Sequence, residues 1–208
     1  MRVQYEPPQP QPPEPPARQL KLNAASELKN ALTGQARIDV SLKQAISNIE
    51  KSLNSSYWVD ERHLDPRDGD KVFHYEKLAA NDLKSLARGG NLPQNIRELV
   101  SRVQGNLLEA DRRLAATAIK EARESANGLV DAALLAKAMA AYAKASTEMM
   151  GRTPDIAQAI EHYQQAWEYA TKALTNNPAA TSGLRLGPRD FNKDNDKDKD
   201  RDKNDKRG

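Results

Sequence analysis

The chain has 208 residues, no cysteine, 32 basic and 29 acidic side chains, and three histidines. The lack of cysteine excludes a disulfide scaffold, thiolate metal sites and a cysteine nucleophile. The net charge of +3 is small and dispersed, without the concentrated basic face of a nucleic-acid-binding protein, so we expect no nucleic-acid partner. No apolar run approaches the ~20 residues of a membrane-spanning helix, so we also predict no transmembrane segment.

The two ends of the chain differ in composition from the part between them. Residues 1–18 hold seven of the twelve prolines, and the run EPPQPQPPEPP favours extended polyproline II geometry. This predicts a disordered linker, with a ligand for a proline-binding domain as the alternative. Residues 178–208 predict a disordered tail, because basic and acidic side chains nearly alternate toward its end. The tail aspartates lack the glycine and glutamate of an EF-hand loop, so we predict no calcium site.

Between the ends, apolar residues recur at helical spacing, with glycine or proline separating most of the runs. The predicted helices cover about residues 20–32, 38–53, 70–86, 93–125, 132–150 and 156–174. The fourth is the longest and would span roughly 50 Å. The fifth is rich in alanine, which lets neighbouring helices approach closely, and we therefore expect it at the centre of the bundle. The sequence predicts an all-α domain over residues 19–177, an antiparallel bundle of five to six helices.

The central stretch, residues 57–77 (YWVDERHLDPRDGDKVFHYEK), interrupts the helical pattern between the second and third helices. It holds four of the ten aromatic residues, two of the three histidines and six acidic side chains. Within it, Pro66 suits the second position of a tight turn, Gly69 permits a left-handed exit, and Asp70 suits the first turn of the next helix. These features predict an ordered aromatic and acidic loop.

The bulky side chains of this stretch predict a structural role. Tyr57 and Trp58 would plug the open end of the bundle, with Val59 and Leu64 beside them, while the acids cap helices or face water. The residues expected to build the structural loop are Tyr57, Trp58, Asp60, His63, Leu64, Asp65, Pro66, Gly69 and Phe73.

A metal or hydrolytic site in the central stretch is the alternative. His63, Asp65 and His74 offer borderline and hard ligands. No pair matches the H-x3-H or HExxH spacing on one helix, and the chain has no G-x-S-x-G elbow, P-loop or G-x-G-x-x-G motif. We therefore predict no metal site, no cofactor and no catalytic residue.

The last predicted helix carries a prominent aromatic pair. Tyr163 and Trp167 are four residues apart on its apolar stripe, which predicts core packing. The alternative is a possible interaction face made by Tyr163, Trp167 and Tyr169, of which Tyr169 falls off the stripe. The helix resembles the second helix of a tetratricopeptide repeat, but only one half-repeat is present, so a repeat array is not predicted.

Three ordered motifs carry a broader resemblance. They are SLN...YWVD...HLDP...G.KVF..EK, then L.EADR.LA.TAI, then A.EHY..AWE.A.KAL, and they span about residues 38–174. Together they resemble an uncharacterised all-helical module that recurs in secreted or surface multidomain proteins of bacteria and archaea. The resemblance implies a helical architecture and an extracellular or cell-envelope location, and it implies no catalytic residues. No signal peptide is visible in the sequence. If the chain is not exported, we expect a cytoplasmic location.

The favoured interpretation is a non-enzymatic structural or interaction module, an accessory spacer domain whose partner is a protein or a cell-envelope component. One alternative is a helical adaptor that binds a protein or peptide through an exposed groove. The other is a metal site at residues 57–77. An exposed apolar patch would favour the adaptor. Converging histidine and aspartate side chains would favour the metal site, and a closed bundle with neither feature would favour the spacer.

Overall fold

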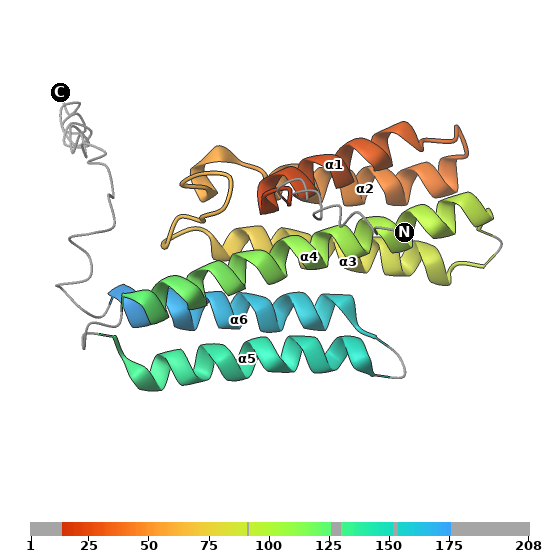
Figure 1. The fold of residues 1–208 in the computed structure, drawn as a ribbon. Coiled ribbons are helices and arrows are strands. Elements are labelled where there is room, and N and C mark those ends of the chain that lie inside the picture. The colour runs from red at the N-terminus through yellow and green to blue at the C-terminus, as the bar shows by residue number, and fades with distance from the viewer. Residues whose placement is uncertain (1–13, 91, 126–129, 152–153, 176–208) are drawn as a thin grey trace, which may run out of the picture.

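The computed structural model describes residues 14–90, 92–125, 130–151 and 154–175 (Figure 1). These residues form six α-helices and no strand, and consecutive helices run in opposite directions, which confirms the predicted all-α bundle. No helix among them is long and apolar enough to cross a membrane. The elements are α1 (Ala17–Asn30), α2 (Ala36–Ser52), the 3-10 turn η1 (Ser55–Tyr57), α3 (Asp70–Arg88), α4 (Gln94–Glu124), α5 (Ala132–Met150) and α6 (Ile156–Thr175).

The order of packing places α5 at the edge of the bundle. Helices α1 to α4 pack together, α6 packs against α3 and α4, and α5 packs on the far side of α6 with only a narrow contact to α4 (Figure 1). The expected central position of α5 is therefore wrong. Alanine permits close approach on any face of a helix, but it does not determine how many of those faces have a neighbour. On α5, only Ala138, Ala141 and Ala145 are buried.

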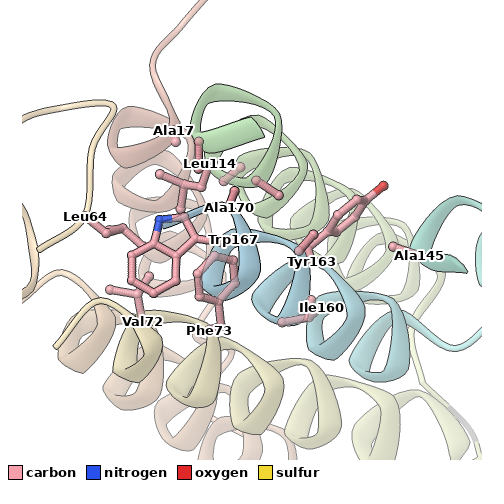
Figure 2. Close-up of a cluster of buried hydrophobic side chains, with 14 of the residues drawn as sticks. Ala17, Leu64, Val72, Phe73, Leu114, Ala145, Ile160, Tyr163, Trp167 and Ala170 are labelled. Atoms are coloured by element: carbon pink, nitrogen blue, oxygen red, sulfur yellow. The ribbon is translucent and has the colours of Figure 1, made fainter. Parts of the chain in front are cut away.

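Two apolar clusters form the core, and both draw side chains from α1, α3 and α4. The long α4, of 31 residues, reaches both clusters because its apolar stripe continues along most of its length. The α6 cluster includes Trp58. Figure 2 shows further members of it: Phe73, Leu114, Ile160, Tyr163 and Trp167. The α2 cluster includes Leu28, Leu42, Ile49, Leu83, Val103 and Leu107.

The folded part begins earlier than the predicted boundary at residue 19. Helix α1 starts at Ala17, and the guanidinium of Arg113 donates to the Pro15 carbonyl at 2.6 Å and pairs with Glu14 at 3.0 Å. The rest of the predicted linker, residues 1–13, and most of the predicted tail, residues 178–208, lie outside the described residues.

Candidate functional site

The structural loop turns back on itself between α2 and α3. Trp58 and Leu64 form an antiparallel bridge, in which the amide of Val59 donates to the His63 carbonyl at 2.9 Å. The Asp60 carboxylate closes the tip of the loop by accepting from the backbone N–H of Arg62 and of His63, at 2.7 and 2.9 Å. These bonds make the loop locally self-supporting.

Trp58 joins this loop to α1 and α2. Its ring is 7% exposed, and its Nε1 donates to the Ser52 carbonyl at 2.8 Å. The charged groups of Arg18 and Lys21 lie 5.8 and 5.6 Å from the ring centroid, within the range of a cation–π contact. Val59 is 56% exposed, so its expected place in the plug is wrong: successive side chains of an extended segment point to opposite sides.

Other loop residues hold the turn and the neighbouring packing. Tyr57 is half-buried and its ring lies 6.4 Å from that of Tyr75. The Asp65 carboxylate accepts from the Arg67 amide at 2.8 Å, across the turn that contains Pro66. Phe73 is fully buried.

Gly69 is needed for space rather than for a left-handed backbone. Its φ of −67° is right-handed, which corrects the expected left-handed exit. A Cβ at this position would lie 2.6 Å from Leu64 Cβ and 2.8 Å from the ring of Trp167, both shorter than real side chains allow. The absence of a side chain therefore lets the turn lie directly against α6.

A buried ionic cluster, the Lys21 triad, lies beneath Trp58. The Lys21 ammonium from α1 bonds to the Glu76 carboxyl of α3 and to Asp111 Oδ1 of α4, the latter at 2.8 Å. All three side chains are inaccessible to solvent. Glu76 Oε2 and Asp111 Oδ2 are buried without a hydrogen-bond partner among the described residues.

Burial and charge act against each other in this triad. Burial opposes the charge on Lys21, but the carboxylates of Asp111 and Glu76 outweigh it and hold the Lys21 pKa above its ordinary value. Burial raises the pKa of Glu76 well above its usual range, and the nearby Asp111 charge adds to the rise more than Lys21 offsets it. A protonated Glu76 can donate to Asp111, so the triad is satisfied best with one lysine cation, one carboxylate and one carboxylic acid.

His63 bridges the loop to α4, but not in the way a metal site requires. Its Nδ1 faces Asp60 Oδ2 and its Nε2 faces Glu121 Oε1, each at 2.7 Å. Because the two ring nitrogens point in different directions, the two carboxylates lie on different sides of the imidazole and cannot share one ion with it. Partial burial opposes protonation, but the bond to Asp60 and the charge of Glu121 prevail and raise the His63 pKa.

The structure does not bring the three candidate metal ligands together. Asp65 contacts Arg67, and His74 is exposed on α3 with its ring edge-on to Tyr75 at 5.5 Å. Among the described residues, no group of three histidine, aspartate or glutamate side chains could hold a metal ion. Glu121, which does reach His63, could not be found from spacing because 58 residues separate the two.

The aromatic pair of α6 lies in the core. Tyr163 and Trp167 are 3% and 5% exposed, so neither ring is available as a surface platform. Figure 2 shows Trp167 packed against Phe73, and the two ring centroids lie 5.8 Å apart. Tyr169 is half-buried, with the Lys137 ammonium 5.9 Å from its ring centroid.

A groove of about 650 Å³ runs between α4 and α5. Ile119 of α4 and Tyr142 of α5 are half-buried in its walls, and Met139 of α5 is 48% exposed. Two contacts fix Tyr142 in the groove wall. Its ring meets that of Tyr163 edge-on at a centroid distance of 5.2 Å, and its hydroxyl accepts a hydrogen bond from Arg112 at 3.3 Å. We call this feature the α4–α5 groove, and its lining residues are Ala116, Ile119, Lys120, Arg123, Glu124, Met139 and Tyr142.

The apolar surface continues from the groove onto the outer face of α5. Met150 is 85% exposed, and further small residues on this face are exposed along the length of the helix. The exposed residues of this outer face are Ala132, Ala133, Ala136, Ala140, Ala143, Thr147 and Met150. The sequence signal for this surface was the distribution of apolar residues around α5, which covers more of the helix than one neighbouring helix can bury. The same distribution also fits a helix at the centre of a bundle.

No family model matches the chain, and neither a curated protein nor a solved structure matches it. The resemblance carried by the three ordered motifs therefore stays a prediction. The function has to be inferred from the chemistry of the chain's own exposed surfaces.

Proposed function

We propose that this chain is a non-catalytic protein-interaction module that docks a helix of a partner protein in the α4–α5 groove. The observation that carries the proposal is the exposed apolar wall of the groove, formed by Met139 beside the half-buried Ile119 and Tyr142. Two other exposed apolar side chains lie apart from this groove: Val40 on α2, and Val59, which lines a smaller pocket of about 250 Å³ beside Trp167.

The energetics of surface exposure support a docking role over a closed spacer. Burying one large apolar side chain stabilises a complex by roughly 1.5–3 kcal/mol before the cost of ordering is subtracted. A continuous apolar surface on a soluble domain commonly marks an interaction site, whereas scattered apolar residues do not. Here the groove and the outer face of α5 are continuous, so one partner could cover both.

The shape of the surface supports a helical partner. The groove lies between two antiparallel helices, and α5, of 19 residues, offers a length of about 28 Å. The alanines beside the groove keep the surface low, so that a partner helix can lie close to α5 along this whole length. This arrangement corresponds to the helix-in-groove mode of peptide recognition.

The remainder of the fold provides a rigid support for the groove. Helix α4, which forms one wall, is tied to α1 and α3 by the Lys21 triad and to the structural loop by His63. Helix α6 joins α4 to α5, and its Tyr163 holds Tyr142 in the groove wall. A groove on rigid elements binds with a smaller ordering cost.

The proposal can be tested with a displayed library of amphipathic helical peptides that have an apolar stripe and uncharged glutamine flanks. The full chain should select binders whose affinity falls sharply in Met139→Glu, because a carboxylate would have to be desolvated in the interface. Val40→Glu is the matched control, since it places the same charge at an exposed apolar position on α2. Binders indifferent to Met139→Glu, or no binders at all, would overturn the proposal, provided that circular dichroism shows both variants folded.

A further inference from the structure

We infer that the partner helix of the α4–α5 groove is acidic, with an apolar face toward Met139 and Ile119 and carboxylates along the flank that faces Lys120 and Arg123 of α4. This inference rests on the proposed function and adds the chemical class of the partner. Its basis is the set of charges on the α4 wall of the groove.

The α4 border of the surface is basic. Lys120 and Arg123 line the groove and are exposed, and Arg123 has no ion pair among the described residues. Glu124 is the one opposing charge in this wall, and its carboxylate lies 3.8 Å from the Lys120 ammonium. A carboxylate on the near flank of a docked helix would therefore meet an unpaired guanidinium.

The far side of α5 is basic as well, but it does not border the groove. Lys137 and Lys144 are exposed and lie seven residues apart, so both project from the same side of the helix. Helical geometry places this side beyond the alanine face, on the edge away from the groove. Neither lysine has an ion pair among the described residues, and Glu148 is the acidic neighbour on the same side.

A second copy of the chain is a poorer occupant than an acidic helix. If two outer faces of α5 met in antiparallel register, Lys137 of one copy would approach Lys144 of the other. Like charges at that position disfavour the pair. An acidic helix in the groove instead gains attraction from Lys120 and Arg123 along the flank next to α4, and its apolar side chains fill the groove.

Three synthetic peptides of about 20 residues test this inference. They share one Ala, Leu and Met stripe and carry glutamate, glutamine or lysine at every flank position. We expect the glutamate peptide to bind the full chain about tenfold more tightly than the glutamine peptide, and the lysine peptide more weakly than both. Fluorescence anisotropy measures the affinities, and the difference should shrink as salt screens the flank charges.

Paired charge removals locate the effect. Lys120→Gln with Arg123→Gln should reduce the advantage of the glutamate peptide, whereas Lys137→Gln with Lys144→Gln, on the far side of α5, should leave it unchanged. Lys43→Gln with Arg88→Gln is the matched control, because it removes the same charge from exposed positions on α2 and α3.

The outcomes separate this inference from the function on which it rests. If the three peptides bind equally and Met139→Glu weakens all of them, the groove docks a helix but the acidic partner is wrong. Concentration-dependent dimers that Met139→Glu dissociates would make a second copy the occupant and overturn the inference. If peptides bind only after residues 176–208 are removed, the chain's own C-terminal end is the occupant of the groove. That result would also overturn the inference.

Discussion

Lys21 Nζ lies 2.8 Å from Asp111 Oδ1, although 90 residues separate the two in the chain. On α1 the lysine lies between Leu20 of the α6 cluster and Ala24 of the α2 cluster. The Lys21 triad is thus a polar layer at the boundary between the two apolar clusters. Sliding any of its three helices by one turn would leave a buried charge without its partner, so the layer favours one register of the bundle.

Removing the cation should destabilise the fold strongly. We expect Lys21→Met to lower the free energy of unfolding by about 3–5 kcal/mol, because two buried carboxyl groups would lose their shared partner. Urea denaturation followed by circular dichroism measures the change. The combined variant Lys21→Met, Glu76→Met and Asp111→Leu should recover most of the loss, since apolar side chains need no partner. A triple variant as unstable as the single one would show that packing, and not charge, sets the cost.

The raised pKa of Glu76 gives a second expectation. A carboxyl group with a raised native pKa keeps a proton that the unfolded chain releases, so stability falls as pH rises above the ordinary value of 4.5. Glu76→Gln keeps the shape and removes the titration. Its stability relative to the natural chain should therefore increase with pH from about 4.5 upward until the raised pKa is passed. Denaturation curves at several pH values test this, and the exposed Glu98→Gln variant is the control. If the stabilities of Glu76→Gln and of the natural chain change with pH in parallel, the expectation is contradicted.

Most of the helices follow directly from periodicity. The apolar stripes of α2, α4 and α6 predict their positions to within a few residues, because each stripe faces a continuous core. The position of α5 did not follow, since periodicity reports which residues can be buried and not which neighbour covers them. The α4–α5 groove was therefore beyond prediction, because it depends on how α4, α5 and α6 meet.

The Lys21 triad left a signal in the sequence that spacing alone could not interpret. In α3, Glu76 takes its turn in the stripe Val72, Glu76, Ala79 and Leu83, with spacings of four, three and four residues. In α4, Asp111 occupies the same kind of position between Leu107 and Leu114. A charged residue on an apolar stripe implies a buried partner, but three separate helices had to be placed together before the partners could be named.

Gly69→Ala should destabilise the fold although glycine itself is a poor helix former. The new Cβ would overlap Leu64 and Trp167, and such overpacking typically costs about 1–3 kcal/mol. Gly105→Ala is the matched control: Gly105 is exposed within α4 and has open space around it. That change should stabilise by about 0.5–1 kcal/mol through helix propensity. Thermal melts of both variants test the contrast, and a neutral or stabilising Gly69→Ala would refute the close packing of the turn on α6.

The His63 bridge should weaken as the pH rises. The raised pKa means that the charged imidazole stabilises the native state fully below the ordinary value of 6.5, and this stabilisation is lost as the pH passes through the raised pKa. The difference in melting temperature between the natural chain and His63→Gln should therefore be largest in mildly acidic solution and decline toward alkaline pH. The exposed His74→Gln variant is the control. A difference that does not change with pH would mean that His63 acts only through neutral hydrogen bonds.

Trp58 should be the main apolar anchor of the structural loop. Trp58→Ala is expected to lower the free energy of unfolding by about 3–5 kcal/mol, the usual range for a buried large-to-small change. The same truncation at the adjacent, exposed Val59 should stay within about 0.5 kcal/mol. Trp58→Phe, which keeps a ring but removes the Nε1 bond to the Ser52 carbonyl, should fall between them. Chemical denaturation ranks the three variants by their loss in free energy of unfolding. A chelator should leave the stability of all of them unchanged, because a structural loop needs no metal ion. Equal effects at positions 58 and 59 would contradict the anchoring role, since both residues belong to the same loop and differ in which way the side chain points.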